Sequence, residues 1–157
     1  MSRLRSRPEG YILDVGGQII SKPLDLVIGE TPHTRVCLLK TDVDGFDYDV
    51  LNSASSTIKK HKPIIFFELQ YSEVAQKNGF RETLESLFRR GYNDFTVFDN
   101  FGELMFRSNQ IREIIQLMEY IWRQNVGLAA RTIYYFDILA AARRADSLVI
   151  DAALSSY

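Results

Sequence analysis

The sequence predicts an α/β domain with a mostly parallel sheet and antiparallel strands toward its C-terminal end. Two continuous apolar runs, Val36–Thr41 and Pro63–Leu69, are typical of strands buried on both faces. An amphipathic helical pattern separates the two runs, which makes a βαβ unit. Farther along the chain, the turn signal Asp99-Asn100-Phe101-Gly102 lies between two β-prone runs and predicts an antiparallel hairpin.

Length and composition indicate one domain of ordinary globular type. The chain has 157 residues, of which 46% are hydrophobic and 25% are charged, and its formal net charge is -1. This balance excludes collagen-like and disordered proteins. The near-zero charge argues against a nucleic-acid binder. No apolar run reaches the length of about 18 residues that a membrane helix needs, so no membrane association is expected.

The N-terminal part of the chain predicts a leader followed by a hairpin. Residues 1–10 are basic and lack the apolar stretch of a secretory signal, so we expect a flexible leader before a single domain over residues 11–157. β-prone residues flank Gly16-Gly17, and both turn positions tolerate positive φ. The short apolar segment 24–28 is compatible with a helix or a strand. Cys37 lies in an apolar run and predicts a packed thiol; a single cysteine fits a cytoplasmic location.

Periodicity predicts the remaining elements. Within the βαβ unit, apolar residues recur at spacing four and predict one helix: Phe46, Val50, Ala54 and Ile58. Further helices are predicted over residues 80–90, where Gly91 is the C-terminal cap, and over residues 109–124. Residues 132–139 are aromatic and β-branched, which predicts a final strand.

Acidic residues follow both buried runs, which makes the strand ends the candidate site. Asp42 and Asp44 follow the first run, and Glu68 lies near the end of the second. Ligands gather at the carboxyl ends of strands in open α/β sheets, so the three carboxylates converge if the strands are neighbours. Neighbouring carboxylates raise one another's pKa and can act as a general base or bind a cation. The alternative is that Asp42 caps the following helix and Glu68 is solvated at the rim of the sheet.

Two stretches of the chain resemble a known family. Leu39–Asp47 reads LKTDVDGFD, and after Val50-Leu51 the segment Lys62–Glu68 reads KPIIFFE. These motifs resemble the FkbM family of S-adenosylmethionine-dependent methyltransferases. That family shows a lysine, an aspartate, a glutamate and a glycine before a Val-Leu pair and a proline-led strand that ends in glutamate. Asp44 stands where the family has glutamate, and weaker matches extend the likeness over residues 20–142.

The resemblance implies a Rossmann-like class I methyltransferase sheet and transfer of a methyl group from S-adenosylmethionine. The acceptor would be an oxygen of a sugar or of another small molecule. The implied catalytic residues are Asp42, Asp44 and Glu68, and the implied cofactor-binding residues are Lys40 and Asp42. Asp42 would contact acceptor or cofactor with Asp44 assisting, and Glu68 would face the same cleft. Lys40 would pair with one of these acids, since a buried lysine needs a partner.

The cofactor-binding half of the family's domain has the weakest counterpart in this sequence. The segment 14–18, DVGGQ, lacks a later glycine and lies too close to Lys40 for two βα units, so the hairpin interpretation is preferred. The chain then resembles the C-terminal half of the domain. The alternative function is a non-catalytic α/β remnant, an interaction or oligomerisation module whose uncovered strand edge pairs with a partner chain or a second copy. No metal-ligand spacing links the histidines to Cys37, so no metal site is expected.

Overall fold

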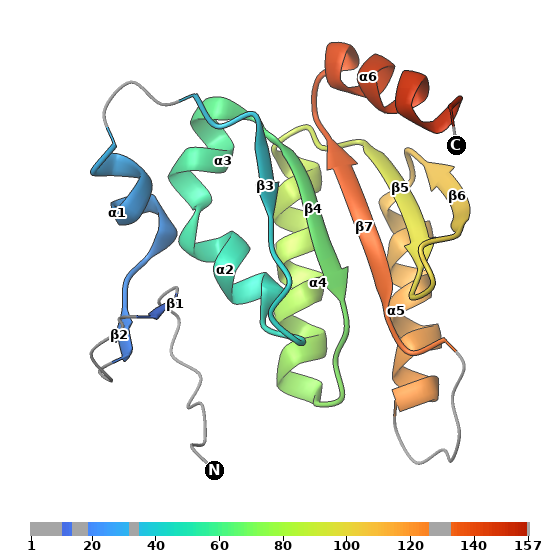
Figure 1. Ribbon diagram of the computed structural model, residues 1–157. Helices are drawn as coiled ribbons and strands as arrows, with labels where there is room; N and C mark the ends of the chain where they lie inside the picture. The colour runs from blue at the N-terminus through green and yellow to red at the C-terminus, as the bar shows by residue number, and fades with distance from the viewer. Residues whose placement is uncertain (1–10, 14–18, 32–34, 126–132, 157) are drawn as a thin grey trace.

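A computed structural model describes residues 11–13, 19–31, 35–125 and 133–156 of the chain (Figure 1). Two short strands, β1 (Tyr11–Leu13) and β2 (Ile19–Ser21), pair antiparallel near the N-terminus. This pairing confirms the predicted N-terminal hairpin, while its glycine turn and the predicted leader over residues 1–10 lie outside the described residues. None of the helices within these ranges is long and apolar enough to cross a membrane.

The main sheet has five strands in the spatial order β3-β4-β7-β5-β6. Their bounds are β3 Leu38–Lys40, β4 Ile64–Leu69, β5 Asp94–Asp99, β6 Leu104–Ser108 and β7 Phe136–Ala141. The β3–β4 pair is parallel, whereas β7 runs antiparallel to both β4 and β5, and β6 runs antiparallel to β5. The prediction of a mostly parallel sheet is therefore wrong. The reason is that β7 returns from late in the chain and inserts between β4 and β5 in the opposite direction.

The crossover from β3 to β4 consists of two short helices and not of the single helix predicted. The first, α2 (Asp47–Ser53), has Ala54 as its C-cap, and the second, α3 (Ser55–His61), begins directly after Ala54. The Asp25 carboxylate, which belongs to α1 (Leu24–Gly29), accepts hydrogen bonds of 2.7 and 2.8 Å from two N–H groups in the first turn of α3. First-turn N–H groups have no partner within their own helix. A side chain from α1 therefore caps α3 and supports the break.

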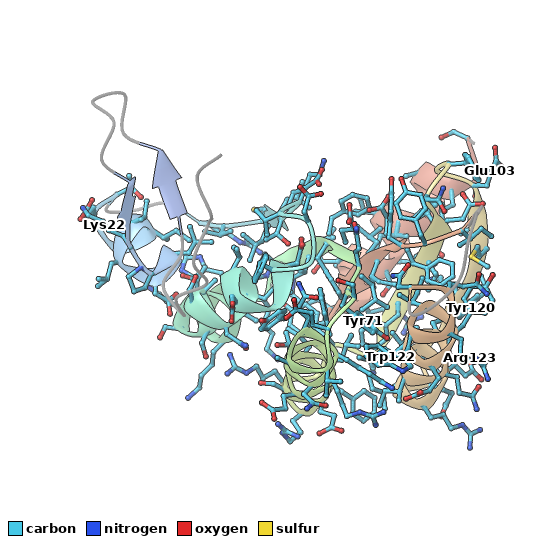
Figure 2. The ribbon with its side chains drawn as sticks, turned by 90° about the horizontal axis from the view of Figure 1, so that it is seen from below. Lys22, Tyr71, Glu103, Tyr120, Trp122 and Arg123 are labelled. Carbon is cyan, nitrogen blue, oxygen red and sulfur yellow. The ribbon has the colours of Figure 1, made fainter. Side chains whose placement is uncertain are left out.

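Helices α4 (Val74–Arg89) and α5 (Ile111–Asn125) lie behind the sheet in Figure 1. Both predicted helices are confirmed, although α4 begins earlier than its pattern indicated. Side chains of a strand alternate between the two faces, and on β4 the fully buried members of this alternation are Ile65, Phe67 and Leu69. Between the two helices, the rings of Tyr71 and Trp122 stack with centroids 6.4 Å apart (Figure 2). A last helix, α6 (Arg144–Leu154), follows β7 and was not predicted.

The strand β3 forms one edge of the sheet and is open on one face. Leu38 is 59% exposed, whereas Leu39 is only 8% exposed. Cys37, directly before the strand, is also exposed. The predictions of a strand buried on both faces and of a packed thiol are therefore wrong for β3. The reason is that side chains alternate between the two faces of a strand, and only Leu39 of the three residues of β3 lies on the covered face.

Candidate functional site

The ends of β3 and β4 lie side by side, as the sequence predicts. The two strands are parallel, and Lys40 lies opposite Phe66. The turn after β3 therefore runs beside the last residues of β4. Asp42 and Asp44 belong to this turn, and Glu68 belongs to the end of β4. The arrangement brings the predicted carboxylates to one edge of the sheet, which we call the acidic edge.

Glu68 is the buried member of the acidic edge. It is only 8% exposed, and its Oε1 atom has no hydrogen-bond partner among the described residues. Burial, together with nearby negative charges, raises its pKa from 4.5 to about 7; those charges are on Asp47, Asp42, Asp137 and Asp44. The alternative of a Glu68 solvated at the rim is therefore wrong. A buried carboxyl with this pKa can accept or release a proton near neutral pH.

Asp47 is a buried neighbour of the acidic edge and was not among the predicted site residues. It is fully buried at the start of α2. Its Oδ1 accepts hydrogen bonds from the Thr41 hydroxyl at 2.5 Å and from the Glu68 backbone N–H at 3.3 Å, and its Oδ2 accepts one from the Val43 N–H at 3.3 Å. Burial raises the pKa of Asp47, and these hydrogen bonds oppose the rise. The family motif contains this position, but the motif alone did not indicate that its carboxylate faces inward.

The two acids of the turn are exposed, in contrast to Glu68 and Asp47. The side chain of Asp42 is 60% exposed, and its Oδ2 lies 3.4 Å from the Lys40 Nζ. The predicted pairing of Lys40 with an acid is thus confirmed, although the pair is at the surface. Asp42 does not cap α2, because the N-cap residue is Phe46 and makes no side-chain cap. Asp44 adopts a positive φ of 49° in the turn.

Asp137 completes the acidic edge from a distant part of the chain. It belongs to β7 and lies opposite Glu68 in the antiparallel register. Burial raises its pKa, as does the charge of Asp42, while Lys40 opposes the rise. An antiparallel strand begins at the edge where its parallel neighbours end. Strand direction is thus the signal that could have identified Asp137.

Among the described residues, no three acidic, histidine or cysteine side chains are grouped closely enough to hold a metal ion. The carboxylates instead surround Glu68 from different elements, with Lys40 as a nearby cation. The edge therefore carries excess negative charge, which attracts a cationic ligand.

The residues of the edge fit two features of S-adenosylmethionine. Its ribose carries two hydroxyl donors, and the exposed carboxylate of Asp42 is an acceptor at this edge. Its sulfonium sulfur carries a positive charge, which the excess of carboxylates complements. Lys40 stands over the Phe66 ring with its Nζ 5.7 Å from the centroid, beside Asp42. The glycine-rich candidate turn over residues 14–18 lies outside the described residues.

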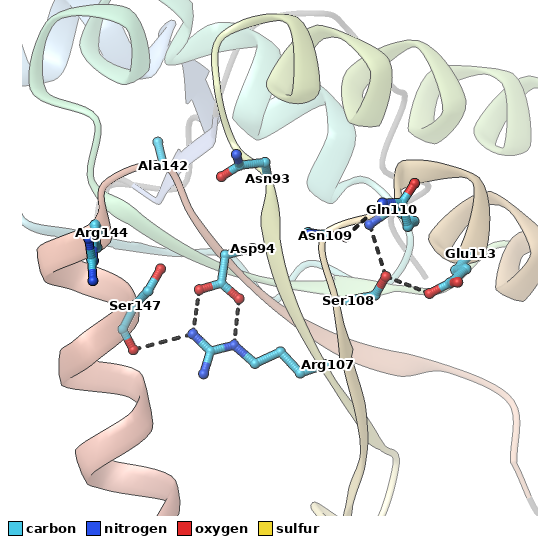
Figure 3. A pocket seen from close by; sticks show the side chains of 10 residues that line it. All are labelled: Asn93, Asp94, Arg107, Ser108, Asn109, Gln110, Glu113, Ala142, Arg144 and Ser147. Atoms are coloured by element: carbon cyan, nitrogen blue, oxygen red, sulfur yellow. Dashed lines mark hydrogen bonds and ion pairs between the residues drawn. The ribbon is translucent and has the colours of Figure 1, made fainter.

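Two cavities lie away from the acidic edge. One of about 800 Å³ is lined by residues at the start of β5, the end of β6 and the first turns of α5 and α6 (Figure 3). Arg107 is one of the residues that line this cavity. Its guanidinium donates hydrogen bonds to the Asp94 carboxylate and to the Ser147 carbonyl. The other, of about 450 Å³, lies between β6 and α5 and includes Tyr120 and Phe136. Neither cavity is lined by the predicted site residues.

Comparison with known proteins identifies the family. The model of the methyltransferase FkbM domain matches residues 14–93, about half of the chain, including β3, β4 and the turn that carries Asp42 and Asp44. No curated protein and no solved structure matches the chain. The matched segment contains the motifs from which the resemblance was drawn, and the chain belongs to the FkbM methyltransferase family.

Proposed function

We propose that the chain transfers a methyl group from S-adenosylmethionine to a hydroxyl oxygen of a sugar or another small acceptor, with Glu68 as the general base. The observation that carries this proposal is the state of the Glu68 carboxyl at the end of β4. Its Oε1 is buried without a partner among the described residues, and its pKa is about 7. A pKa raised toward neutrality suits proton transfer in either direction.

The chemistry assigned to the chain itself is proton transfer and alignment. When bound, S-adenosylmethionine supplies an electrophilic methyl group and leaves as a neutral thioether. The acceptor hydroxyl would donate a hydrogen bond to the Glu68 carboxylate, and its proton would pass to that carboxylate as the oxygen bonds to the methyl carbon. Alignment of the acceptor oxygen with the methyl carbon is the other requirement of such a transfer.

The exposed residues of the acidic edge have supporting roles in this proposal. Asp42 contacts the acceptor or the ribose hydroxyls, and Asp44 assists from the same turn. Lys40 orients the Asp42 carboxylate, from which its Nζ lies 3.4 Å away. We further infer that the five strands are the C-terminal half of a Rossmann-like sheet, since the family match includes the parallel β3–β4 pair with its helical crossover. The exposed thiol of Cys37 suits a reducing, cytoplasmic location.

The test combines methyl transfer and binding. The unsubstituted chain is incubated with S-adenosylmethionine labelled on its methyl group and a panel of small alcohols and sugars. Binding of S-adenosylhomocysteine is measured by calorimetry. E68Q is expected to lose a factor of about 100 to 10,000 in turnover while it still binds S-adenosylhomocysteine. E85Q, which removes a carboxylate from the surface of α4, is the control and should retain full turnover.

Two results would contradict the proposed function. The first is an absence of both labelled product and binding heat with the unsubstituted chain. The second is an E68Q variant with unchanged turnover, which would assign the proton transfer to another group.

A second candidate function, an interaction module, is favoured by the open edge strand. Leu38 is 59% exposed on β3, and the outer side of this strand is unpaired among the described strands. An exposed apolar edge is a template for pairing with a second copy or a partner chain. Light scattering at high protein concentration tests this candidate. A mass of two copies that falls to one in L38K supports it, and a monomer at all concentrations contradicts pairing between copies.

A further inference from the structure

One buried carboxylate connects the three backbone segments that form the acidic edge. Asp47, at the start of α2, accepts hydrogen bonds from the end of β3 through Thr41, from the turn through Val43 and from β4 through the backbone of Glu68. Its side chain is fully buried. This side chain therefore helps to hold the Glu68 backbone beside the turn, in addition to the pairing of β4 with β3 and β7.

The charge of Asp47 is not cancelled by the groups that hold it. The three donors are a hydroxyl and two backbone amides, none of which carries a formal charge. The negative charge of Asp47 therefore acts on neighbouring groups, because burial weakens the screening of that charge by water. Burial is the largest cause of the raised pKa of Glu68. Among the nearby charges, Asp47 makes the largest contribution.

We propose that Asp47 is a positioning residue for Glu68, which fixes the backbone of the acidic edge and repels negative charge on the Glu68 carboxyl. This inference rests on the proposed role of Glu68 as the general base. Asp47 reaches the reaction only through Glu68, because all its hydrogen bonds described above end on the protein. Its removal should change the proton affinity of Glu68 in addition to any change in stability.

Other charged or titratable groups also face Glu68, and they set the size of the expected effect. They come from the turn after β3, from β7 and from the residue before it: Asp42, Asp44, Asp137 and Tyr135. Lys40 pairs with Asp42 at the same edge. Asp47 differs from the other acids because its carboxylate is hydrogen-bonded to the Glu68 backbone. Removal of Asp47 should thus lower the pKa of Glu68 by about one pH unit, while burial and the remaining acids keep it above the ordinary value.

Carbon-13 NMR titration of the Glu68 carboxyl tests the coupling without any ligand. In D47N the midpoint of Glu68 is expected to fall by about one pH unit. The matched control is D49N, which removes the same charge from the first turn of the same helix; Asp49 is not among the main charges that raise the pKa of Glu68. A folded D47N protein with the same Glu68 midpoint as the unsubstituted chain would overturn the inference.

The unsubstituted chain provides a second measurement in case D47N does not fold. Coupled groups report one another's titration. The Asp47 carboxyl resonance should therefore show a step at the midpoint of Glu68, and the Asp49 resonance should show none. Absence of the step at Asp47 overturns the inference by itself.

The pH profile of methyl transfer separates this inference from the proposed function. If Asp47 acts through Glu68, the acidic limb of the turnover profile shifts to lower pH by about one unit in D47N and stays in place in D49N. Turnover that depends on Glu68 but keeps its profile in D47N contradicts the role of Asp47 alone. A chain with neither turnover nor binding of S-adenosylhomocysteine contradicts the proposed function, and the NMR titration still decides whether the two carboxyls are coupled.

Discussion

Replacement of Glu68 by glutamine is expected to stabilise the protein above neutral pH and to leave its stability unchanged under acidic conditions. Burial, with nearby carboxylates, raises the pKa of Glu68 from 4.5 to about 7 in the folded state. Between these values the folded protein keeps a proton that the unfolded chain has released, so the free energy of unfolding decreases as the pH rises. The difference between the two pKa values corresponds to a loss of about 3 kcal/mol in the unfolding free energy above neutral pH. Partial screening by solvent reduces this loss to about 2 kcal/mol. Glutamine has a similar shape and does not ionise.

Urea unfolding followed by circular dichroism measures this effect at about pH 4, below both pKa values, and at about pH 8, above both. E68Q should exceed the unsubstituted protein by about 2 kcal/mol at the higher pH and match it at the lower one. The control E85Q should stay within about 0.5 kcal/mol at both, as expected for a surface substitution. The reasoning is refuted if the unfolding free energy of E68Q differs from that of the unsubstituted protein by the same amount at both pH values. It is also refuted if E68Q is the less stable protein at pH 8. Such a result would mean that the folded state does not disfavour the charge on Glu68.

Three further predictions concern packing, capping and exposure. A Cβ atom on Gly79 would lie 2.4 Å from ring carbons of Tyr48, so G79A should lower the unfolding free energy by about 1 to 3 kcal/mol in urea; an unchanged midpoint would contradict this close approach. D25A removes the cap of α3 and should cost about 1 to 2 kcal/mol in the same assay, whereas an equally stable variant would show that the cap contributes little. Cys37 is exposed, so the folded protein should react fully with a thiol reagent in the absence of urea, and protection until unfolding would contradict the exposure.

The local elements of this fold follow from short-range patterns in the sequence. The hairpin around Asp99 and the helices α4 and α5 are confirmed because turn chemistry and helical periodicity depend on neighbouring residues. The break at Ala54 depends on Asp25, which approaches from another helix. The insertion of β7 between β4 and β5 depends on pairing across most of the chain. Periodicity carries no information on such distant contacts.

The same division holds for the acidic edge. The sequence by itself determined that Asp42, Asp44 and Glu68 follow or end two neighbouring apolar runs, and that this segment belongs to the methyltransferase FkbM domain. Only the tertiary structure decided which carboxylate is buried. Neighbouring strands and the start of α2 shield Glu68 from water. Its proton affinity rises because of this burial and because Asp47 and other acids lie close to it. Burial and charge proximity are properties of the assembled chain, so residue type and spacing could indicate the place of the chemistry but not its strength.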